Sequence, residues 1–349
     1  MPSSLNLSYL DIVNRADNFH LYPPKPSAEA LVPFLLSPSH SAYPPIGLIR
    51  PSVLLELQKD KEWRKSHGLK EIWDIQLAPL AHRSYVAFAP SCNTPAKRTR
   101  AMKETCTRWR DSGIFPDIIG PSKWRSEWYD VYRTPFGALR VEGGEPMEYE
   151  GGEKEENYAF SMERSACALF GVVTFGVHLS VYEEDEDGIR MWIPRRAKTK
   201  PTWPGYLDNS VAGGIPGGIT PYESIVKEAM EEASLPADLV HKYIKATGCI
   251  SYFYQTDRGW LQPEVEFVYD MRVPKGEIDL RPMDGEVESF ALLPLDEVIS
   301  HMRAGEFKAN CAIVIIDFLI RKGLITPENE PDFLEIITRL HGRFDIERW

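Results

Sequence analysis

The sequence predicts an α/β (α+β) fold, built on a mixed sheet with helices on its faces and preceded by a smaller, mostly helical N-terminal domain. Three observations support this prediction. β-rich and helical segments alternate after residue 158, helical patterns joined by Pro-rich stretches fill the region before residue 145, and a Gly- and Glu-rich segment lies between them. Strands interleaved with helices are typical of a sheet whose faces are covered by helices.

The N-terminal part is predicted to be helical at three places. Leu7–Phe19 has helical periodicity, and Pro51 and Pro95 stand where helices begin, because proline is favoured at the first helical position. An aromatic row follows near the end of this part: Trp124, Trp128, Tyr129 and Tyr132. Such a row indicates packing in a core or an interface, with stacking on a ligand as the alternative.

The second part alternates between strands and helices. The β-rich segments 169–182 and 191–193 flank EDEDG at 184–188, which predicts a hairpin turn. The later elements are a helix at 221–235, strands at 247–254, 264–273 and 287–293, and helices at 295–303, 309–322 and 331–341. The predicted division of the chain is an N-terminal domain of unknown fold at 1–145, a linker at 146–157, a main domain at 158–325 and a C-terminal helix at 326–349.

Composition excludes several classes of function. The chain has 349 residues, and 40 Lys and Arg against 51 Asp and Glu give a net charge of −11, which argues against nucleic-acid or anionic-membrane partners. The longest apolar run, Cys311–Ile320, is too short to span a bilayer. The N-terminus has no signal or transit pattern, and the five cysteines lack CxxC spacing, so we expect a cytoplasmic protein without disulfides or a zinc site.

The most informative segment is a glycine-rich loop followed by a helix, AGGIPGGITPYESIVKEAMEEASL at 212–235. Thr220, Pro221 and Glu223 form a capping box that begins the helix. An apolar stripe follows at helical spacing: Ile225, Val226, Ala229, Met230 and Ala233. The loop glycines, among them Gly213 and Gly214, allow a ligand to approach the backbone closely at the helix N-terminus.

Three glutamates gather on the other side of this helix. Glu228, Glu231 and Glu232 lie within one turn, where like charges repel by roughly 0.2–0.5 kcal/mol per pair. A solvated helix face is one interpretation. The other is a divalent cation site, because Mg²⁺ prefers hard oxygen ligands and binds substrate phosphates as well. The preceding glycine-rich loop favours the metal site.

At this point the chain resembles the Nudix hydrolases, whose box is G-x5-E-x7-R-E-U-x-E-E-x-G-U. With Gly213 as the box glycine, the metal-binding glutamates of the family fall on Glu228, Glu231 and Glu232. Three positions depart from the box: Ile219 replaces its first glutamate, Lys227 its arginine and Ser234 its second glycine. A register with Gly217 and Glu223 would satisfy G-x5-E, but it loses the R-E-U-x-E-E half. The resemblance implies an α/β/α sandwich.

The segments MERSACALFGVVTFGVHLSVY and MWIPRRAKTKPTWPGYLDNSVAGG are similar to the thiamine-pyrophosphokinase-related Nudix subfamily, over about 160–300. That subfamily also lacks the first box glutamate and carries an extra N-terminal domain. It implies hydrolysis of thiamine diphosphate, or its oxidised or damaged analogues, to the monophosphate and phosphate with Mg²⁺ or Mn²⁺. The alternatives are a Nudix hydrolase of another nucleoside-linked diphosphate and a catalytically weakened Nudix module that only binds.

A basic and aromatic stretch before the glycine-rich loop supplies candidate substrate contacts. Arg195, Arg196 and Lys200 are expected to meet the diphosphate, together with the backbone at Gly213 and Gly214, and Trp203 to stack on a heterocycle. Nudix enzymes often add a later acid near the metal, and four candidates remain open: Glu264, Glu266, Asp284 and Glu286. The expected partner is a small-molecule diphosphate. Three roles for the N-terminal part stay open: it could cover the substrate pocket, form the aromatic wall of that pocket or form a homodimer.

Overall fold

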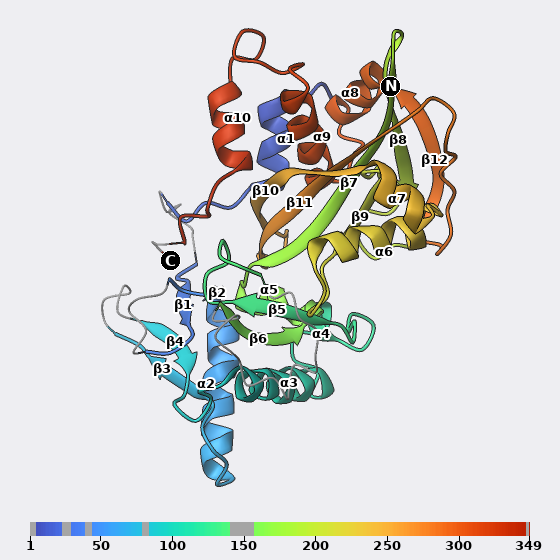
Figure 1. Ribbon diagram of the computed structural model, residues 1–349. Coiled ribbons are helices and arrows are strands. Elements are labelled where there is room, and N and C mark those ends of the chain that lie inside the picture. Colours follow the sequence, from blue (N-terminus) through green and yellow to red (C-terminus); the bar gives the residue numbers. More distant parts are fainter. Residues whose placement is uncertain (1–4, 23–28, 39–43, 79–83, 140–156, 347–348) are drawn as a thin grey trace.

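The computed structural model describes residues 5–22, 29–38, 44–78, 84–139, 157–346 and 349. The polypeptide forms an α/β/α sandwich, with an N-terminal lobe packed beside it (Figure 1). Hydrophobic clusters fill both sides of the central sheet, and a third cluster fills the N-terminal lobe. The predicted fold class is confirmed.

The central sheet is mixed. Its strands run in the order β10-β11-β7-β8-β12, and β9 pairs with β7. β11 and β7 are parallel, whereas the other pairings are antiparallel. The strands are β7 (Thr174–Asp185), β8 (Gly188–Arg196), β9 (Val211–Gly214), β10 (Ile244–Gln255), β11 (Leu261–Val273) and β12 (Val287–Pro294). Asp185 pairs with Gly188, so the predicted hairpin turn is confirmed.

Helices cover both faces of this sheet (Figure 1). One face packs against α6 (Pro221–Ala233) and α7 (Ala237–Tyr243). The other face packs against α1 (Tyr9–Ala16), α8 (Leu295–Arg303), α9 (Ala309–Arg321) and α10 (Phe333–Leu340). All were predicted except α7, whose seven residues are too few to show a helical period. No helix among the described residues is long and apolar enough to cross a membrane.

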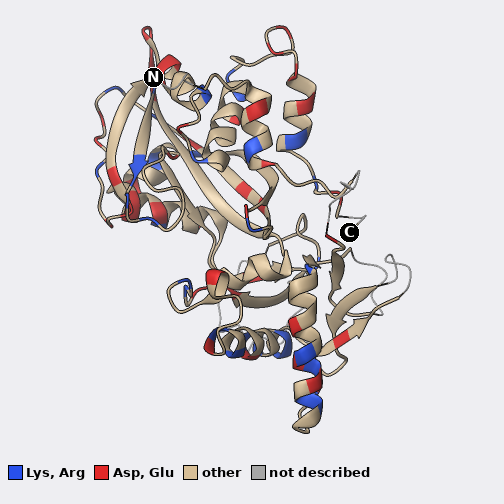
Figure 2. Ribbon diagram, turned by 180° about the vertical axis from the view of Figure 1, so that it is seen from behind, with Lys and Arg blue, Asp and Glu red and all other residues tan. Residues whose placement is uncertain are grey.

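The N-terminal lobe contains strands as well as the predicted helices. Its helices are α2 (Pro51–Ser66), α3 (Pro95–Asp111), α4 (Pro116–Ile119) and α5 (Cys167–Phe170), and the first two begin at the predicted prolines. A four-stranded sheet has β1 (Val32–Leu35), β2 (Gly47–Ile49), β3 (Trp73–Gln76) and β4 (Tyr85–Phe88). Because these strands have only three or four residues, their alternation is too short to recognise, and the prediction of a mostly helical lobe was incomplete. Figure 2 shows basic and acidic residues interspersed along α2 and α3.

A two-stranded ribbon of this lobe, β5 (Trp128–Tyr132) and β6 (Tyr158–Glu163), lies next to the sandwich (Figure 1). β5 carries part of the predicted aromatic row, and Tyr129 and Tyr132 are buried, as core packing requires. The predicted linker at 146–157 lies outside the described residues except for Asn157. β6 follows the predicted linker in sequence but packs with the core of the N-terminal lobe. α1 precedes the linker but packs on the sandwich. The division into 1–145, 158–325 and 326–349 stays a prediction.

Candidate active site

The site begins at the glycine-rich loop between β9 and α6. The predicted capping box is present: Thr220 Oγ1 accepts from the Glu223 amide at 3.1 Å, and the Glu223 carboxylate accepts from the Thr220 amide at 2.8 Å. The predicted apolar stripe packs on the sheet except for Met230, which is 44% exposed. Ser234, which replaces the second box glycine, ends the helix in the left-handed region at φ 55°. Glycine is usual there because it has no Cβ to strain.

Two of the three predicted glutamates lie against β9. Glu228 covers Gly213 so closely that a Cβ at Gly213 would lie 2.4 Å from Glu228 Cδ. One turn later, the Glu232 carboxylate accepts a hydrogen bond from the Ala212 amide at 3.3 Å. Gly213 is therefore needed to admit the Glu228 side chain, and the pairing of β9 with β7 fixes both glutamates relative to the sheet.

Burial makes these two carboxyl groups poor acids. Burial, reinforced by the charge of Glu231, raises the pKa of Glu228 to about 7 against the opposing effect of Lys227. Burial and the charges of Asp208 and Glu228 raise the pKa of Glu232 well above its ordinary value. Both anions are thus costly in the protein alone, and a cation beside them would relieve that cost.

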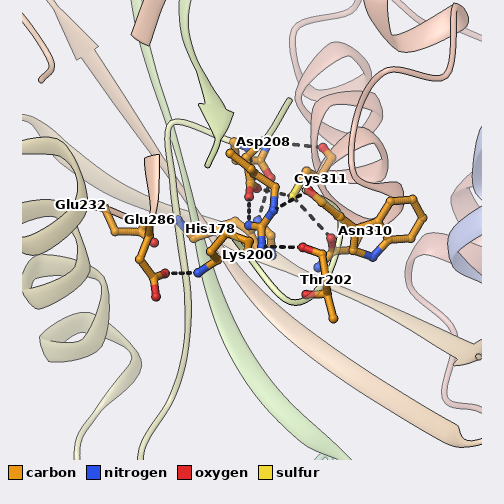
Figure 3. Close-up of polar contacts among 12 residues, drawn as sticks. His178, Lys200, Thr202, Asp208, Glu232, Glu286, Asn310 and Cys311 are labelled. Carbon is orange, nitrogen blue, oxygen red and sulfur yellow. Dashed lines mark hydrogen bonds and ion pairs between the residues drawn. The ribbon is translucent and has the colours of Figure 1, made fainter. Parts of the chain in front are cut away.

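Glu231, the third predicted glutamate, lies apart from this pair. Its side chain is 53% exposed and forms an ion pair with Lys227 at 3.7 Å. The acids that join Glu232 come instead from the segment before β12. Asp284 and Glu286 each offer a carboxylate oxygen, and these atoms and one of Glu232 lie within 4.8 Å of one another. We call Glu232, Asp284 and Glu286 the acidic group. Figure 3 shows Glu232 and Glu286 side by side.

The other two acids that the sequence left open, Glu264 and Glu266, lie on β11 in a buried polar cluster. The Tyr252 hydroxyl donates to both carboxylates, and to Glu266 at 2.9 Å. His178 Nε2 lies 3.6 Å from Glu266, while His178 Nδ1 lies 2.6 Å from the Asn209 side-chain oxygen. Burial and Glu266 raise the pKa of Glu264, whereas His178 lowers that of Glu266 against the effect of burial.

A second polar cluster holds the segment between β8 and β9. Arg196 donates to Asp208 at 2.5 Å and to the carbonyl oxygen of Trp203 at 3.2 Å. The Cys311 thiol also donates to Asp208, at 2.5 Å. Although burial opposes it, the charges of Lys308 and Arg196 lower the pKa of Asp208 to about 2. Asp208 therefore stays an anion that holds the Arg196 guanidinium group in place.

The predicted substrate contacts divide into two sets. Lys200 pairs with Glu286 and so lies at the acidic group, with Arg196 nearby through Asp208. Arg195 instead donates to the carbonyl oxygen of Gly205 at 2.9 Å, and Trp203 meets Tyr206 edge-on at a ring-centroid distance of 5.0 Å. In this structure both serve the local loop, and their substrate roles stay predictions.

Three residues of the N-terminal lobe, two on β5 and one directly after β6, reach the glycine-rich loop, and sequence reasoning missed their role. A Cβ at Gly214 would lie 1.5 Å from the Tyr129 hydroxyl and 3.2 Å from Arg164 Nη2. Arg164 pairs with Glu127 at 2.9 Å, and its charge lowers the pKa of Glu228. Asp130 contacts Gly217 and Gly218. The aromatic row was the only signal, and it indicated packing without naming a partner.

Comparison with known proteins agrees with this geometry. The NUDIX domain family matches residues 174–312, which include β7, the glycine-rich loop, α6 and both later acids. Residues 174–312 are thus similar to a NUDIX domain. The rest of the chain, including the β5–β6 ribbon with Asp130 and the adjoining Arg164, lies outside the match.

Relatives resemble the chain beyond the Nudix domain. An uncharacterized protein of Saccharomyces cerevisiae is 46% identical over 196 residues, which cover 52% of this chain and 56% of that protein. Nudix hydrolase 20, chloroplastic, of Arabidopsis thaliana is 36% identical over 74% of this chain and 62% of its own length. Nudix hydrolase 24, chloroplastic, of the same plant is 36% identical over 74% and 63%. The chain thus spans less than two thirds of the length of these relatives.

Proposed function

We propose that the chain is a metal-dependent Nudix diphosphohydrolase. The observation that carries the proposal is the pair Glu228 and Glu232, two half-buried carboxyl groups with raised pKa values against β9, of which Glu232 lies beside Asp284 and Glu286. A module that only bound a ligand would gain nothing from burying such acids, whereas a cation site requires them.

The donor set fits Mg²⁺ or Mn²⁺, because all its members are carboxylate oxygens. Glu232, Asp284 and Glu286 would hold the ion, with Glu228 and the predicted ligand Glu231 on the same helix. When bound, the ion neutralises the diphosphate and lowers the pKa of a water molecule that attacks phosphorus. We assign to Arg164 and Lys200 the role of binding the diphosphate oxygens, since Arg164 reaches Gly214 of the loop and Lys200 pairs with Glu286.

The proposed substrate is thiamine diphosphate or an oxidised or damaged analogue, cleaved to the monophosphate and phosphate. Its support is the resemblance of 160–300 to the thiamine-related subfamily, including the absence of the first box glutamate. Ile219 stands at that position and lines a small, mainly apolar pocket with Tyr132 and Phe175. An apolar side chain suits these surroundings. This supports the interpretation that the absence of the first box glutamate is a feature of the subfamily and not the loss of an active site.

Release of phosphate or monophosphate tests the proposal. The substrates are thiamine diphosphate, its oxo and oxy analogues, ADP-ribose and NADH, each with Mg²⁺, Mn²⁺ or EDTA. The proposal expects turnover of thiamine compounds that EDTA and Glu232→Gln abolish and that Glu62→Gln, the same change on the exposed face of α2, leaves intact. Turnover of nucleotide diphosphates alone would contradict the proposed substrate. Ligand binding without any turnover would contradict the proposed activity.

We also propose a cytoplasmic location and no nucleic-acid partner, on the basis of five free cysteines and the net charge of −11. Because the plant relatives are named chloroplastic, imaging of a tagged full-length chain is the test. A homodimer stays open, and light scattering in solution decides it.

A further inference from the structure

The glycine-rich loop is held by a strand from outside the Nudix domain. The Gly217 amide donates to the carbonyl oxygen of Trp128 at 2.8 Å, and the Gly218 amide donates to Asp130 Oδ2 at 3.2 Å. Two consecutive loop amides thus end on β5 of the N-terminal lobe. On the sandwich side, Ile215 donates to Phe175 and Ser224 to the Gly214 carbonyl oxygen.

Asp130 is itself fixed in place. It is 8% exposed, and its other oxygen, Oδ1, accepts from Ser161 Oγ at 2.5 Å. The Tyr158 hydroxyl lies 2.7 Å from the same Ser161 oxygen. Oδ1 also packs on the loop, since a Cβ at Gly217 would lie 2.4 Å from it. The carboxylate therefore has little freedom to follow the loop if the loop moves, and Gly217 must lack a side chain.

The loop needs such an anchor because its own sequence lacks one. The family box places a glutamate where this chain has Ile219, whose surroundings are mainly apolar. Glu223 cannot substitute, because its carboxylate is used in the capping box with Thr220. A buried carboxylate that accepts a backbone N–H bond beside a helix N-terminus is also electrostatically favourable.

We infer that Asp130 is a positioning residue of the active site, which holds the glycine-rich loop in place of the missing box glutamate. This inference rests on the proposed function for its kinetic part. The loop connects Gly213, which packs against Glu228, to the start of α6. Helix α6 carries both Glu228 and Glu232. Release of Gly218 lets the loop and the start of α6 shift relative to β9, and a displacement of about 1 Å costs up to 10²-fold in rate.

The test combines hydrogen exchange with kinetics on the full chain. In Asp130→Ala, the amides of Gly217 and Gly218 should exchange about tenfold faster than in the wild type, as expected for loss of one charge-assisted hydrogen bond. The kcat for diphosphate hydrolysis should fall at least tenfold while KM changes less than about threefold. Asp130→Asn keeps an oxygen for Gly218 and should retain most of the protection and of kcat.

The matched control is Asp60→Ala, which removes another buried carboxylate of the same lobe. Asp60 accepts from the Trp73 indole at 2.9 Å and forms ion pairs with Arg64 and Arg108, so its contacts lie on α2, β3 and α3 and not at the loop. It should lower the unfolding temperature without changing loop exchange or the kcat of the folded enzyme. If Asp130→Ala behaves like this control, Asp130 only stabilises the lobe and the inference fails.

Gly217→Ala reaches the same contact from the loop side and serves also if Asp130→Ala does not fold. Introduced alone, Gly217→Ala should accelerate exchange at Gly218 and lower kcat. In the Asp130→Ala background it should add little, because the Asp130 carboxylate with which the new Cβ would clash is gone. Full additivity of the two changes, or no effect of Gly217→Ala, would overturn the inference. If the wild type hydrolyses no diphosphate, the proposed function fails, while the exchange data still decide whether Asp130 holds the loop.

Discussion

Glu228→Gln should stabilise the metal-free protein at neutral and alkaline pH. The pKa of the Glu228 carboxyl group is raised from 4.5 to about 7, chiefly by burial. Since a tenfold change in an acid dissociation constant corresponds to 1.36 kcal/mol, the folded state disfavours this anion by about 3 kcal/mol. Glutamine has nearly the same shape and no charge, so it removes that cost.

The sign of the pH dependence follows from proton binding. Between pH 4.5 and 7 the folded protein holds a proton on Glu228 that the unfolded chain releases, so the free energy of unfolding falls as the pH rises through this window. Below pH 4.5 both states are protonated and the group contributes nothing. The gain from Glu228→Gln should therefore be absent at pH 4.5, grow to about 3 kcal/mol near pH 7 and stay level above it.

Urea unfolding in EDTA, followed by fluorescence at several pH values, measures this difference. Glu231→Gln is the matched control, because Glu231 lies on the same helix, is exposed and has only a surface ion pair, worth at most about 1 kcal/mol. With Mg²⁺ the order should reverse, since binding to the folded state stabilises the wild type and not the variant. A wild type that is as stable as Glu228→Gln at pH 8 in EDTA would refute the reasoning.

Three further predictions follow from the site and its surroundings. Glu286→Gln should weaken Mn²⁺ binding at least tenfold in titration calorimetry, because it removes one oxygen of the acidic group; unchanged affinity would place the ion elsewhere. Gly214→Ala should abolish turnover through its clash with the Tyr129 hydroxyl, and Tyr129→Phe, which deletes that oxygen, should restore part of it in the phosphate-release assay. Cys249, the exposed cysteine, should react first with a thiol reagent in the native protein, while the four buried cysteines react only on unfolding.

The sequence predicts the sandwich well because its elements are long and bounded by local signals. The capping box at Thr220 and Glu223 forms as expected, and the helix at 309–322 is found at Ala309–Arg321. In the structure the same helix carries Glu228 and Glu232 against Gly213 and Ala212, while their role in metal binding stays a prediction. Short strands such as β2 (Gly47–Ile49) were missed, because three residues cannot display a period of two.

The acids that complete the group could not be chosen from the sequence for a different reason. Glu266 alternates with buried apolar residues on β11 and follows the end of the box by 31 residues, whereas Asp284 and Glu286 follow it by 49 and 51. Which of these reaches Glu232 depends on the order of the strands, and β12 lies on the opposite side of β7 and β8 from β11. Strand order is a long-range property, so only the folded structure separates Asp284 and Glu286 from the other two.

The long-range nature of the contact also explains why Ile219, in place of the first box glutamate, reads in the sequence as the loss of a loop-stabilising residue. Read along the chain, a glutamate is missing, and nothing within the 212–235 segment replaces it. In the folded protein a carboxylate does reach the loop, but it comes from Asp130, 88 residues from its partner Gly218 in sequence. The loop amides need a hydrogen-bond acceptor, and a residue on any element that packs against the loop can provide one. A motif therefore has to be judged by the contacts it makes, and here those contacts make the N-terminal ribbon part of the site.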